Sequence, residues 1–370
     1  MKQIICGVLA VLLLLPIMPL SAHHVISAKF DPAKTTRLRG TITKVDWLNP
    51  HVHIFIDVKD AKGVSTNWAV ELESVVDLDR SGWSTGTVKP GETITVDGPV
   101  ARDGTHQIWG NSVSLASGKR VLNVVEKPAV ASNPSNQPVP RGPDGHPRLG
   151  PAPGQTGYWS APTASSLMET GVNAQVDANG LLKNIADASK VAPFQTWARD
   201  LYVLRQRNFL KDDPMFVNCL PPGGPRQFQS RYGIQFLENR ERQRIFVMMG
   251  GANRNWRLIY LDGRAQVGQR QGDDDNPLYF GRSVAKWEGD TLVVDTIGFN
   301  EKFWLSNGGL PHTQQLHLTE RFSRPSFDTL KYEVTIDDPG AYTRKWSSGW
   351  TMSWVPNEDP PEYFCQDNRP

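Results

Sequence analysis

The sequence of 370 residues lacks any long apolar run after its first twenty residues, and it holds only three cysteines. It also lacks an excess of charge, since 40 Lys and Arg stand against 38 Asp and Glu. Balanced charge argues against nucleic acid as a partner, and the missing second apolar run argues against an integral membrane segment in a processed chain. Phosphate-loop, dinucleotide-binding, nucleophile-elbow and CxxC motifs are absent as well, so no organic cofactor is expected.

The first 22 residues have the layout of a secretory signal peptide. A lysine precedes an apolar run over residues 4–20, and the small residues Ser21 and Ala22 follow. The alternative is an uncleaved anchor, but Pro16 and Pro19 favour a processing region over a helix that continues through lipid. We therefore expect a periplasmic or secreted protein that begins at His23.

Cysteine usage agrees with export. Cys6 is lost with the leader, which leaves Cys219 and Cys365 as a pair in an oxidising compartment. The sequence predicts a disulfide between them, with two separate thiols as the alternative.

Residues 23–122 are predicted to form a small β-domain. Five strands are expected, with a short acidic helix over 74–81 between the third and the fourth; the strands cover 38–47, 51–58, 67–73, 93–100 and 107–115. Three strands, a helix and two strands follow one another as in an OB-like barrel.

Proline then recurs over residues 123–165, which predicts an extended linker. Residues 166–215 are expected to be a helical connector, whose apolar face is formed by Phe194, Trp197, Leu201, Leu204 and Asn208. Residues 216–370 contain about eight antiparallel strand candidates, enough for a larger barrel or a sandwich. Gly157-Tyr158-Trp159 has the spacing found near the start of lipocalin barrels. The fold class is therefore mainly β.

Strand alternation brings together imidazoles and carboxylates in the small domain. On the second strand His51 and His53 lie opposite the apolar face, and a three-residue loop to the third strand places His53 across from Glu71. Imidazole and carboxylate ligands suit zinc or copper, and a processed terminus would add His23 and His24. The plainer reading is a set of surface cross-strand contacts.

The larger domain offers an acid on an inward-facing position. Glu320 shares a face with Leu318 and Phe322, so it is either a functional acid or one half of a buried ion pair. The candidate partners are Arg231, Arg244, Arg257, Arg282 and Arg344. Asp295 and His312 are the other candidates for acid–base catalysis, and Trp287 and His317 are the candidate ligand contacts.

Two stretches resemble an uncharacterised family of exported bacterial two-domain proteins. The first is AHHVISAKFD with LRGTITKVDWLNPHVHIFIDV, and the second includes WEGDTLVVDTIGFN and GGLPHTQQLHLTERF. Relatives begin Ala-His-His-Ser, whereas Val25 stands at the fourth position here. They also continue His-Glu-Gly-Asn after the last cysteine, whereas Gln366 follows Cys365. The resemblance implies an OB-like domain and a β-rich companion, with no activity attached.

Three functions remain open. The leading hypothesis is a protein that binds a small apolar or amphipathic molecule in the larger domain, because the 12 tryptophans of the chain suit the lining of an apolar pocket. The second is a cofactor-independent isomerase, lyase or hydrolase that uses Glu320, Asp295 and His312. The third is binding of copper or zinc at the processed terminus. The oligomeric state does not follow from the sequence.

Overall fold

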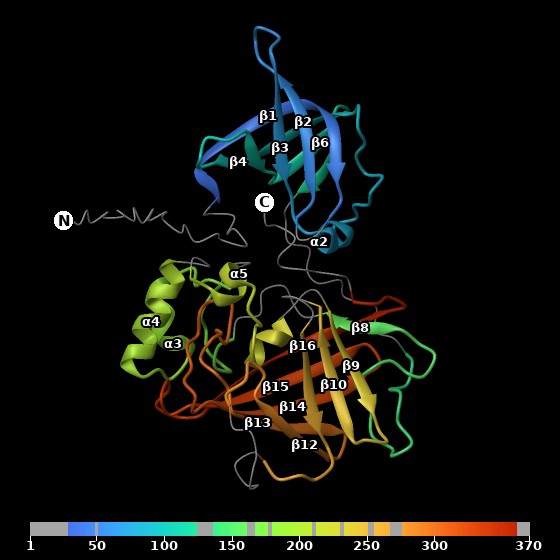
Figure 1. The fold of residues 1–370 in the computed structure, drawn as a ribbon, viewed down its shortest axis with the longest axis vertical. Coiled ribbons are helices and arrows are strands. Elements are labelled where there is room, and N and C mark those ends of the chain that lie inside the picture. The colour runs from blue at the N-terminus through green and yellow to red at the C-terminus, as the bar shows by residue number, and fades with distance from the viewer. Residues whose placement is uncertain are drawn as a thin grey trace, which may run out of the picture.

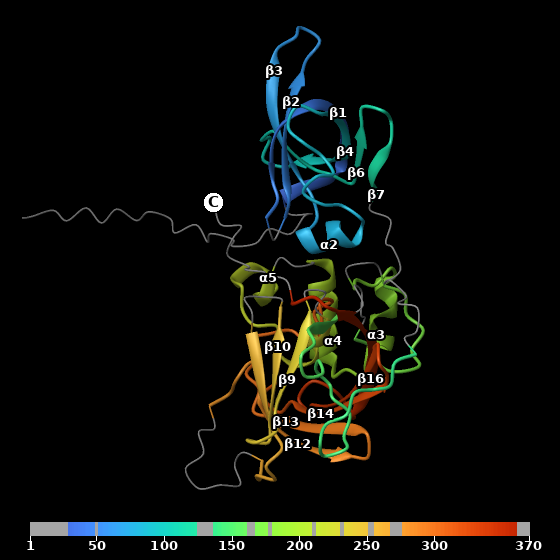
Figure 2. The ribbon, with the colours of Figure 1, turned by 90° about the vertical axis from the view of Figure 1, so that its right-hand side faces the viewer.

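The computed structural model describes residues 29–48, 51–123, 136–160, 167–176, 180–208, 212–229, 233–250, 255–266 and 276–360 (Figure 1). Within them the chain forms two β-barrels, which the two views show as separate lobes (Figures 1 and 2). The mainly β fold class is therefore confirmed. The expected signal peptide, His23, His24 and Cys365 lie outside the described residues.

The small barrel closes through five strands, with two more extending the sheet. Its order is β1-β2-β3-β5-β4, closed by pairing of β1 with β4, and β6 and β7 continue from β4. The elements are β1 (Phe30–Asp46), β2 (His53–Lys59), β3 (Ser65–Glu71), α2 (Val75–Arg80), β4 (Thr93–Ala101), β5 (Gln107–Trp109), β6 (Ser112–Leu115) and β7 (Arg120–Asn123). The order of three strands, helix and further strands agrees with the OB-like expectation.

Local chemistry explains the turns of this barrel. Ser74 caps α2, since its hydroxyl accepts a hydrogen bond from the Asp77 amide at 3.2 Å. Gly63 has φ of 81° in the loop between β2 and β3, the conformation for which glycine was expected there. The predicted strand over 107–115 is divided in two. The Gly110 amide donates to the backbone carbonyl of Glu71, whereas the Asn111 amide donates to the backbone carbonyl of Asp97.

The large barrel is closed by nine strands. They follow the order β10-β11-β12-β13-β14-β15-β16-β8-β9, and all neighbours are antiparallel except β11 and β12. The strands are β8 (Gly157–Ser160), β9 (Ile234–Asn239), β10 (Arg244–Met249), β11 (Asn255–Tyr260), β12 (Arg282–Glu288), β13 (Thr291–Ile297), β14 (His317–Ser326), β15 (Thr329–Asp337) and β16 (Trp346–Pro356). Nine strands and one parallel pair differ from the eight-stranded layout of lipocalins, although Gly157 does begin a barrel strand.

Part of the expected linker belongs to the large barrel. The Trp159 indole donates to the carbonyl oxygen of Leu149 at 2.6 Å, and Arg324 donates to Arg148 and Gly150. Arg141 forms a bidentate pair with Asp290 at 2.9 and 2.6 Å. Proline content suggested an extended chain, but these bonds give partners to the carbonyl oxygens of residues 148–150 and hold this segment against the strands.

The chain between β8 and β9 contains short helices and one longer helix. They are η1 (Ile185–Asp187), α3 (Ala188–Val191), α4 (Thr196–Arg207), α5 (Pro214–Asn218) and η2 (Gly224–Gln229). The predicted buried face of α4 is wrong: Trp197 and Leu204 are exposed, whereas Ala198, Tyr202 and Gln206 are buried. The Gln206 side chain donates a hydrogen bond to the Gly308 carbonyl at 2.6 Å, and this bond turns the face with Ala198, Tyr202 and Gln206 inward. In the described part of the chain, no helix has the length and apolar character needed to cross a bilayer.

Candidate functional site

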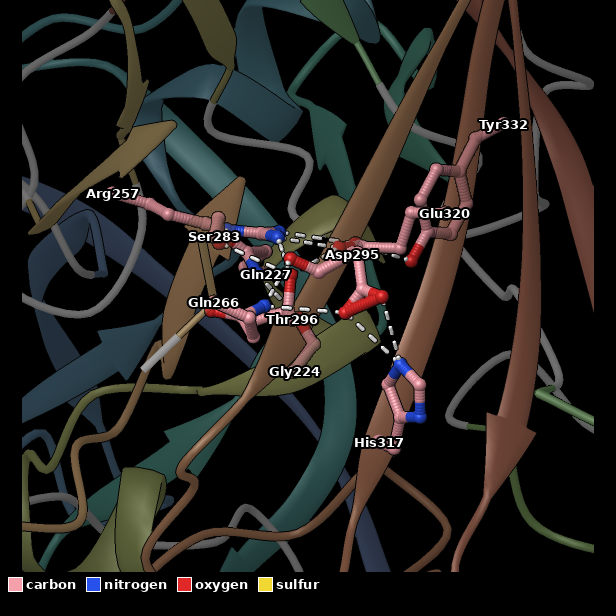
Figure 3. A network of polar contacts seen from close by, with 10 residues as sticks. All are labelled: Gly224, Gln227, Arg257, Gln266, Ser283, Asp295, Thr296, His317, Glu320 and Tyr332. Carbon is pink, nitrogen blue, oxygen red and sulfur yellow. Dashed lines mark hydrogen bonds and ion pairs between the residues drawn. The ribbon is translucent and has the colours of Figure 1, made fainter. Parts of the chain in front are cut away.

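The polar residues inside the large barrel form one closed network (Figure 3). Arg257 of β11 donates to both carboxylate oxygens of Glu320 on β14, at 3.0 and 2.5 Å. Tyr332 of β15 donates to the same carboxylate at 3.0 Å, and Arg257 also donates to Ser283 and Thr296. The expected inward Glu320 and one of its five candidate arginines are thus confirmed as a pair.

The burial of Arg257 and Glu320 indicates that this network has a structural role. Arg257 is 2 % exposed and Glu320 is 0 % exposed. Burial and the nearby Glu320 carboxylate raise the pKa of Tyr332 well above its ordinary value, so the phenol keeps its proton and donates. A buried carboxylate whose oxygens meet a guanidinium and a phenol is held in one place, which suits a barrel brace better than a proton-transfer group.

Asp295 and His317 form a separate pair on the outer face of the same barrel. Asp295 is the register partner of Thr319, one position away from Glu320, so alternation turns it outward. The His317 Nε2 atom lies 3.0 and 3.1 Å from the two Asp295 oxygens. This contact raises the pKa of His317 and lowers the pKa of Asp295.

His312 lies in a third environment. It is 7 % exposed and stacks near Phe303, with ring centroids 4.2 Å apart. Its two ring nitrogens face the carbonyl oxygens of Phe303 and Thr313 at 3.1 and 3.2 Å, and burial lowers its pKa. The three predicted catalytic residues therefore have no contact partner in common, and the structure does not bring Glu320, Asp295 and His312 together.

The two predicted ligand contacts are engaged by protein groups. Trp287 stacks on His146 with ring centroids 4.7 Å apart and an interplanar angle of 5°. His317 is held by Asp295, as described above. Their use as ligand contacts stays a prediction.

A segment that the sequence reading overlooked fills the large barrel. Every residue of η2 is buried, and the Phe228 ring packs between Phe322 and Tyr332 at centroid distances of 5.1 and 4.7 Å. Gly223, with φ of 30°, allows this entry, since a Cβ there would lie 2.5 Å from the Phe303 ring. The double glycine in PPGGP was the available signal.

The small barrel also carries a buried carboxylate. Glu71, the last residue of β3, is 1 % exposed, and its register partner on β2 is His53, as alternation predicted. The His53 Nε2 lies 3.6 Å from Glu71 Oε2, and the His51 Nε2 lies 3.9 Å from Oε1. Lys29, which the sequence reading did not single out, places its Nζ 2.9 Å from Oε2.

Backbone carbonyls fix the tautomers of both histidines. The His51 Nδ1 lies 2.9 Å from the Leu72 oxygen, and the His53 Nδ1 lies 3.1 Å from the His51 oxygen. Because a carbonyl oxygen only accepts, each Nδ1 must carry the proton, and in the neutral ring each Nε2 then carries the lone pair. Both lone pairs are directed to the side of the ring where Glu71 lies.

Neighbouring groups hold this arrangement in place. His51 precedes β2 and meets the Trp109 ring edge-on, with centroids 5.4 Å apart and an angle of 82°. Strand alternation also predicts His51 across from Glu73, but β2 begins at His53 and β3 ends at Glu71, so these two residues are not ladder partners. Among the described residues, no three His, Cys, Asp or Glu side chains gather closely enough to form a metal site on their own.

Cys219 is buried at the end of α5, with φ of 54°. Since Cys365 lies outside the described residues, their pairing stays a prediction.

Comparisons with known proteins add one match. No curated protein matches the chain, and no solved structure matches it. Residues 12–109, which include His51, His53 and Glu71, match the model of a family of unknown function (DUF6152), and the expected likeness to an uncharacterised family is thereby confirmed for this part of the chain.

Proposed function

We propose that this is an exported protein whose small barrel binds a transition-metal ion, zinc or copper, beside Glu71. The ligands are Glu71, His51 and His53, with His23 and His24 of the processed terminus completing the set. One observation carries the proposal: two imidazoles give their Nδ1 protons to backbone carbonyls and turn their Nε2 lone pairs toward one buried carboxylate.

The distances support a shared cation. Two ligands at about 2.0–2.2 Å from a tetrahedral ion lie roughly 3.3–3.6 Å from each other. The Nε2 to carboxylate separations of 3.6 and 3.9 Å are close to this value. They are longer than the 2.7–3.2 Å expected of a direct N–H···O bond.

The hydrogen bonds made by the Nδ1 atom of each histidine also support a shared metal ion. A histidine that ligates a metal commonly donates its other N–H to a carbonyl or carboxylate, which fixes the ring and raises its basicity. His51 and His53 both make such a bond. The edge-on contact of His51 with Trp109 further restricts its rotation.

The described donors alone do not complete a metal site, so the proposal includes the amino terminus. Cleavage after Ala22 would give His23 a free amino group, which binds copper together with the imidazole. The family match over residues 12–109 spans His23, His24 and the residues around Glu71.

The other expected functions have less support in the described geometry. Phe228 and its neighbours fill the large barrel where an apolar ligand was expected. The acid–base candidates Glu320, Asp295 and His312 have separate partners. Apolar-ligand binding stays a prediction without a supporting contact.

The test is titration of metal-free mature protein, starting at His23, with zinc and copper(II) by calorimetry. We expect one ion per chain, and Glu71→Gln or His53→Ala should weaken binding at least about 100-fold, since loss of even an outer-sphere partner costs 10–100-fold. His106→Ala is the matched control, because His106 lies on the same barrel and packs on Trp68.

A second comparison tests the terminus. Protein that retains Ala22 should bind copper more weakly, because the amino nitrogen of His23 becomes an amide. Equal binding by the Glu71 variant and the parent protein would refute the site, whereas equal binding by the extended protein would remove only His23 from the ligand set.

A further inference from the structure

The outer wall of the large barrel is apolar over three neighbouring strands. β9 and β10 lie side by side, and β11 follows β10 (Figures 1 and 2). β11 sends Arg257 into the barrel, so alternation turns the residues on either side of it outward. The outward apolar side chains of the three strands, called the apolar face below, are Leu237, Phe246, Met248, Trp256 and Leu258.

Strand pairing makes the apolar face continuous. Met248 pairs with Trp256, and Phe246 pairs with Leu237 on one side and with Leu258 on the other. The Phe246 and Trp256 rings lie 5.9 Å apart between centroids. Leu237, Met248 and Trp256 are 40, 42 and 58 % exposed, so water covers side chains that would be favourable to bury.

Another part of the same barrel has a polar exterior. Lys331 and Glu333 of β15 form an exposed ion pair, and their ladder partners on β14 are Ser323 and Arg321. Antiparallel sheets that cover a core on one side commonly present polar residues to water in this way. Barrel closure therefore does not require an apolar exterior, and a contiguous apolar patch marks an interaction surface.

One end of the apolar face carries a cation. Arg244 lies on the outward side of β10, and its guanidinium stands over the Tyr260 ring at 5.1 Å. Among the described residues no carboxylate pairs with Arg244, and its Nε atom has no hydrogen-bond acceptor. The outward positions of β9, β10 and β11 hold no acid.

The other charges at this end cancel. Arg264 pairs with Asp262 at 2.6 Å, and the turn before β10 exposes both Glu241 and Arg242. Arg244 therefore leaves the end of the apolar face with a net positive charge. The occupant should combine apolar groups with an anion.

A second copy of the chain does not meet this requirement. In a symmetric pair of sheets packed face to face, Arg244 would meet either its own copy or the apolar rows. Both arrangements bury a cation without a counter-ion, which is costly. The convex wall of a barrel also lacks the groove that a peptide helix needs.

We propose that the apolar face docks on the surface of a lipid bilayer that contains anionic phospholipids. Trp256 and its apolar neighbours enter the interfacial layer, where tryptophan is favoured. Arg244 meets phosphate oxygens of the headgroups. Such docking is peripheral and reversible, and it does not depend on the metal site proposed beside Glu71.

The test is flotation of mature protein, starting at His23, with lipid vesicles at low salt and with chelator present. The vesicles contain either phosphatidylcholine alone or equal parts of phosphatidylcholine and phosphatidylglycerol. The parent should bind the mixed vesicles at least about fivefold more tightly than the neutral ones. Trp256→Ser should weaken binding to both about tenfold, and Arg244→Gln should weaken binding to the mixed vesicles alone about fivefold.

Trp197→Ser and Lys331→Gln are the matched controls. Trp197 is an exposed tryptophan on α4, and Lys331 is an exposed cation on the polar part of the barrel wall. Both variants should float like the parent. Met248→Ser, a second change within the apolar face, should weaken binding as Trp256→Ser does, and it repeats the test if Trp256→Ser does not fold.

Three results would overturn the proposal. The parent does not float with the mixed vesicles, or Trp256→Ser and Met248→Ser float as well as the parent. In the third, light scattering without vesicles shows a dimer that Trp256→Ser converts to a monomer, which assigns the apolar face to a second copy of the chain.

Discussion

Each barrel contains a buried glutamate, and the two glutamates have different partners. Glu320 in the large barrel and Glu71 in the small barrel are 0 % and 1 % exposed. Glu320 is met by Arg257 and Tyr332, both of which are themselves buried. Glu71 is met by Lys29 and His53, which are 22 % and 27 % exposed.

This comparison separates a fixed carboxylate from one whose partners reach solvent. A bidentate guanidinium fixes a carboxylate with two directional bonds and has no route to water once buried. A lysine ammonium on a flexible stem is not fixed in this way, and an imidazole can accept a proton or a cation through its lone pair. Exposure of the partners, rather than burial of the acid, therefore distinguishes the two carboxylates.

The largest effect is expected from Glu320→Gln. It leaves the Arg257 charge buried without its counter-ion, so the free energy of unfolding should fall by about 3–5 kcal/mol. Urea unfolding followed by tryptophan fluorescence measures it. Glu288→Gln is the control, since Glu288 pairs with Lys286 and Arg321 at the surface and should lose less than about 1 kcal/mol. Similar losses of unfolding free energy in Glu320→Gln and Glu288→Gln would show that Glu320 does not brace the barrel.

A smaller effect is expected from Glu71→Gln in metal-free protein. Lys29 can turn to water when the carboxylate charge is removed, so the loss should be about 1.5–3 kcal/mol, the range for a hydrogen bond to a charged group. The same unfolding experiment applies, with chelator present throughout. A loss as large as that of Glu320→Gln would mean that both carboxylates are structural.

The smallest effect concerns the exposed pair of Asp295 and His317, which also joins an imidazole to a carboxylate but without burial of the acid. The raised pKa of His317 means that its contribution is complete below the ordinary histidine pKa and is lost as pH rises through the raised value. The lowered pKa of Asp295 means that its contribution is lost as pH falls through that lowered value.

We therefore expect His317→Gln to lower the free energy of unfolding at pH 5 by less than about 1 kcal/mol, and to change it little at pH 9. Both side chains are more than one-third exposed, at 37 % and 46 %, so solvent screens the pair. Asp295→Asn should remove the same pH dependence. A difference that persists unchanged at pH 9 would assign the effect to packing.

Alternation along strands predicted much of the candidate site. It placed His53 opposite Glu71, and it turned Glu320 into the large barrel toward an arginine. These predictions succeeded because a strand residue has only two faces, and the apolar neighbours identify the inner one. Gly63 and Ser74 were likewise predictable, since their turn and cap depend on local backbone geometry.

Features that depend on distant contacts were not predictable in this way. The buried face of α4 was misassigned because Gln206 bonds to Gly308, about a hundred positions away in the chain. Phe228 enters the large barrel from a glycine-rich turn that has no periodic pattern. Residues 136–160 pack on the barrel through hydrogen bonds of their backbone, which proline content does not reveal.

The sequence by itself determined that the described chain is built of β-strands, which faces of those strands are apolar, and which polar residues interrupt them. These properties depend on neighbours within a few positions, so the order of residues is sufficient. Only the tertiary structure decided which cation stands beside each buried acid, since Arg257 and Lys29 are 63 and 42 positions away from their partners. Closure of each barrel creates those contacts, and it buries Arg257 while it leaves the Lys29 side chain 22 % exposed.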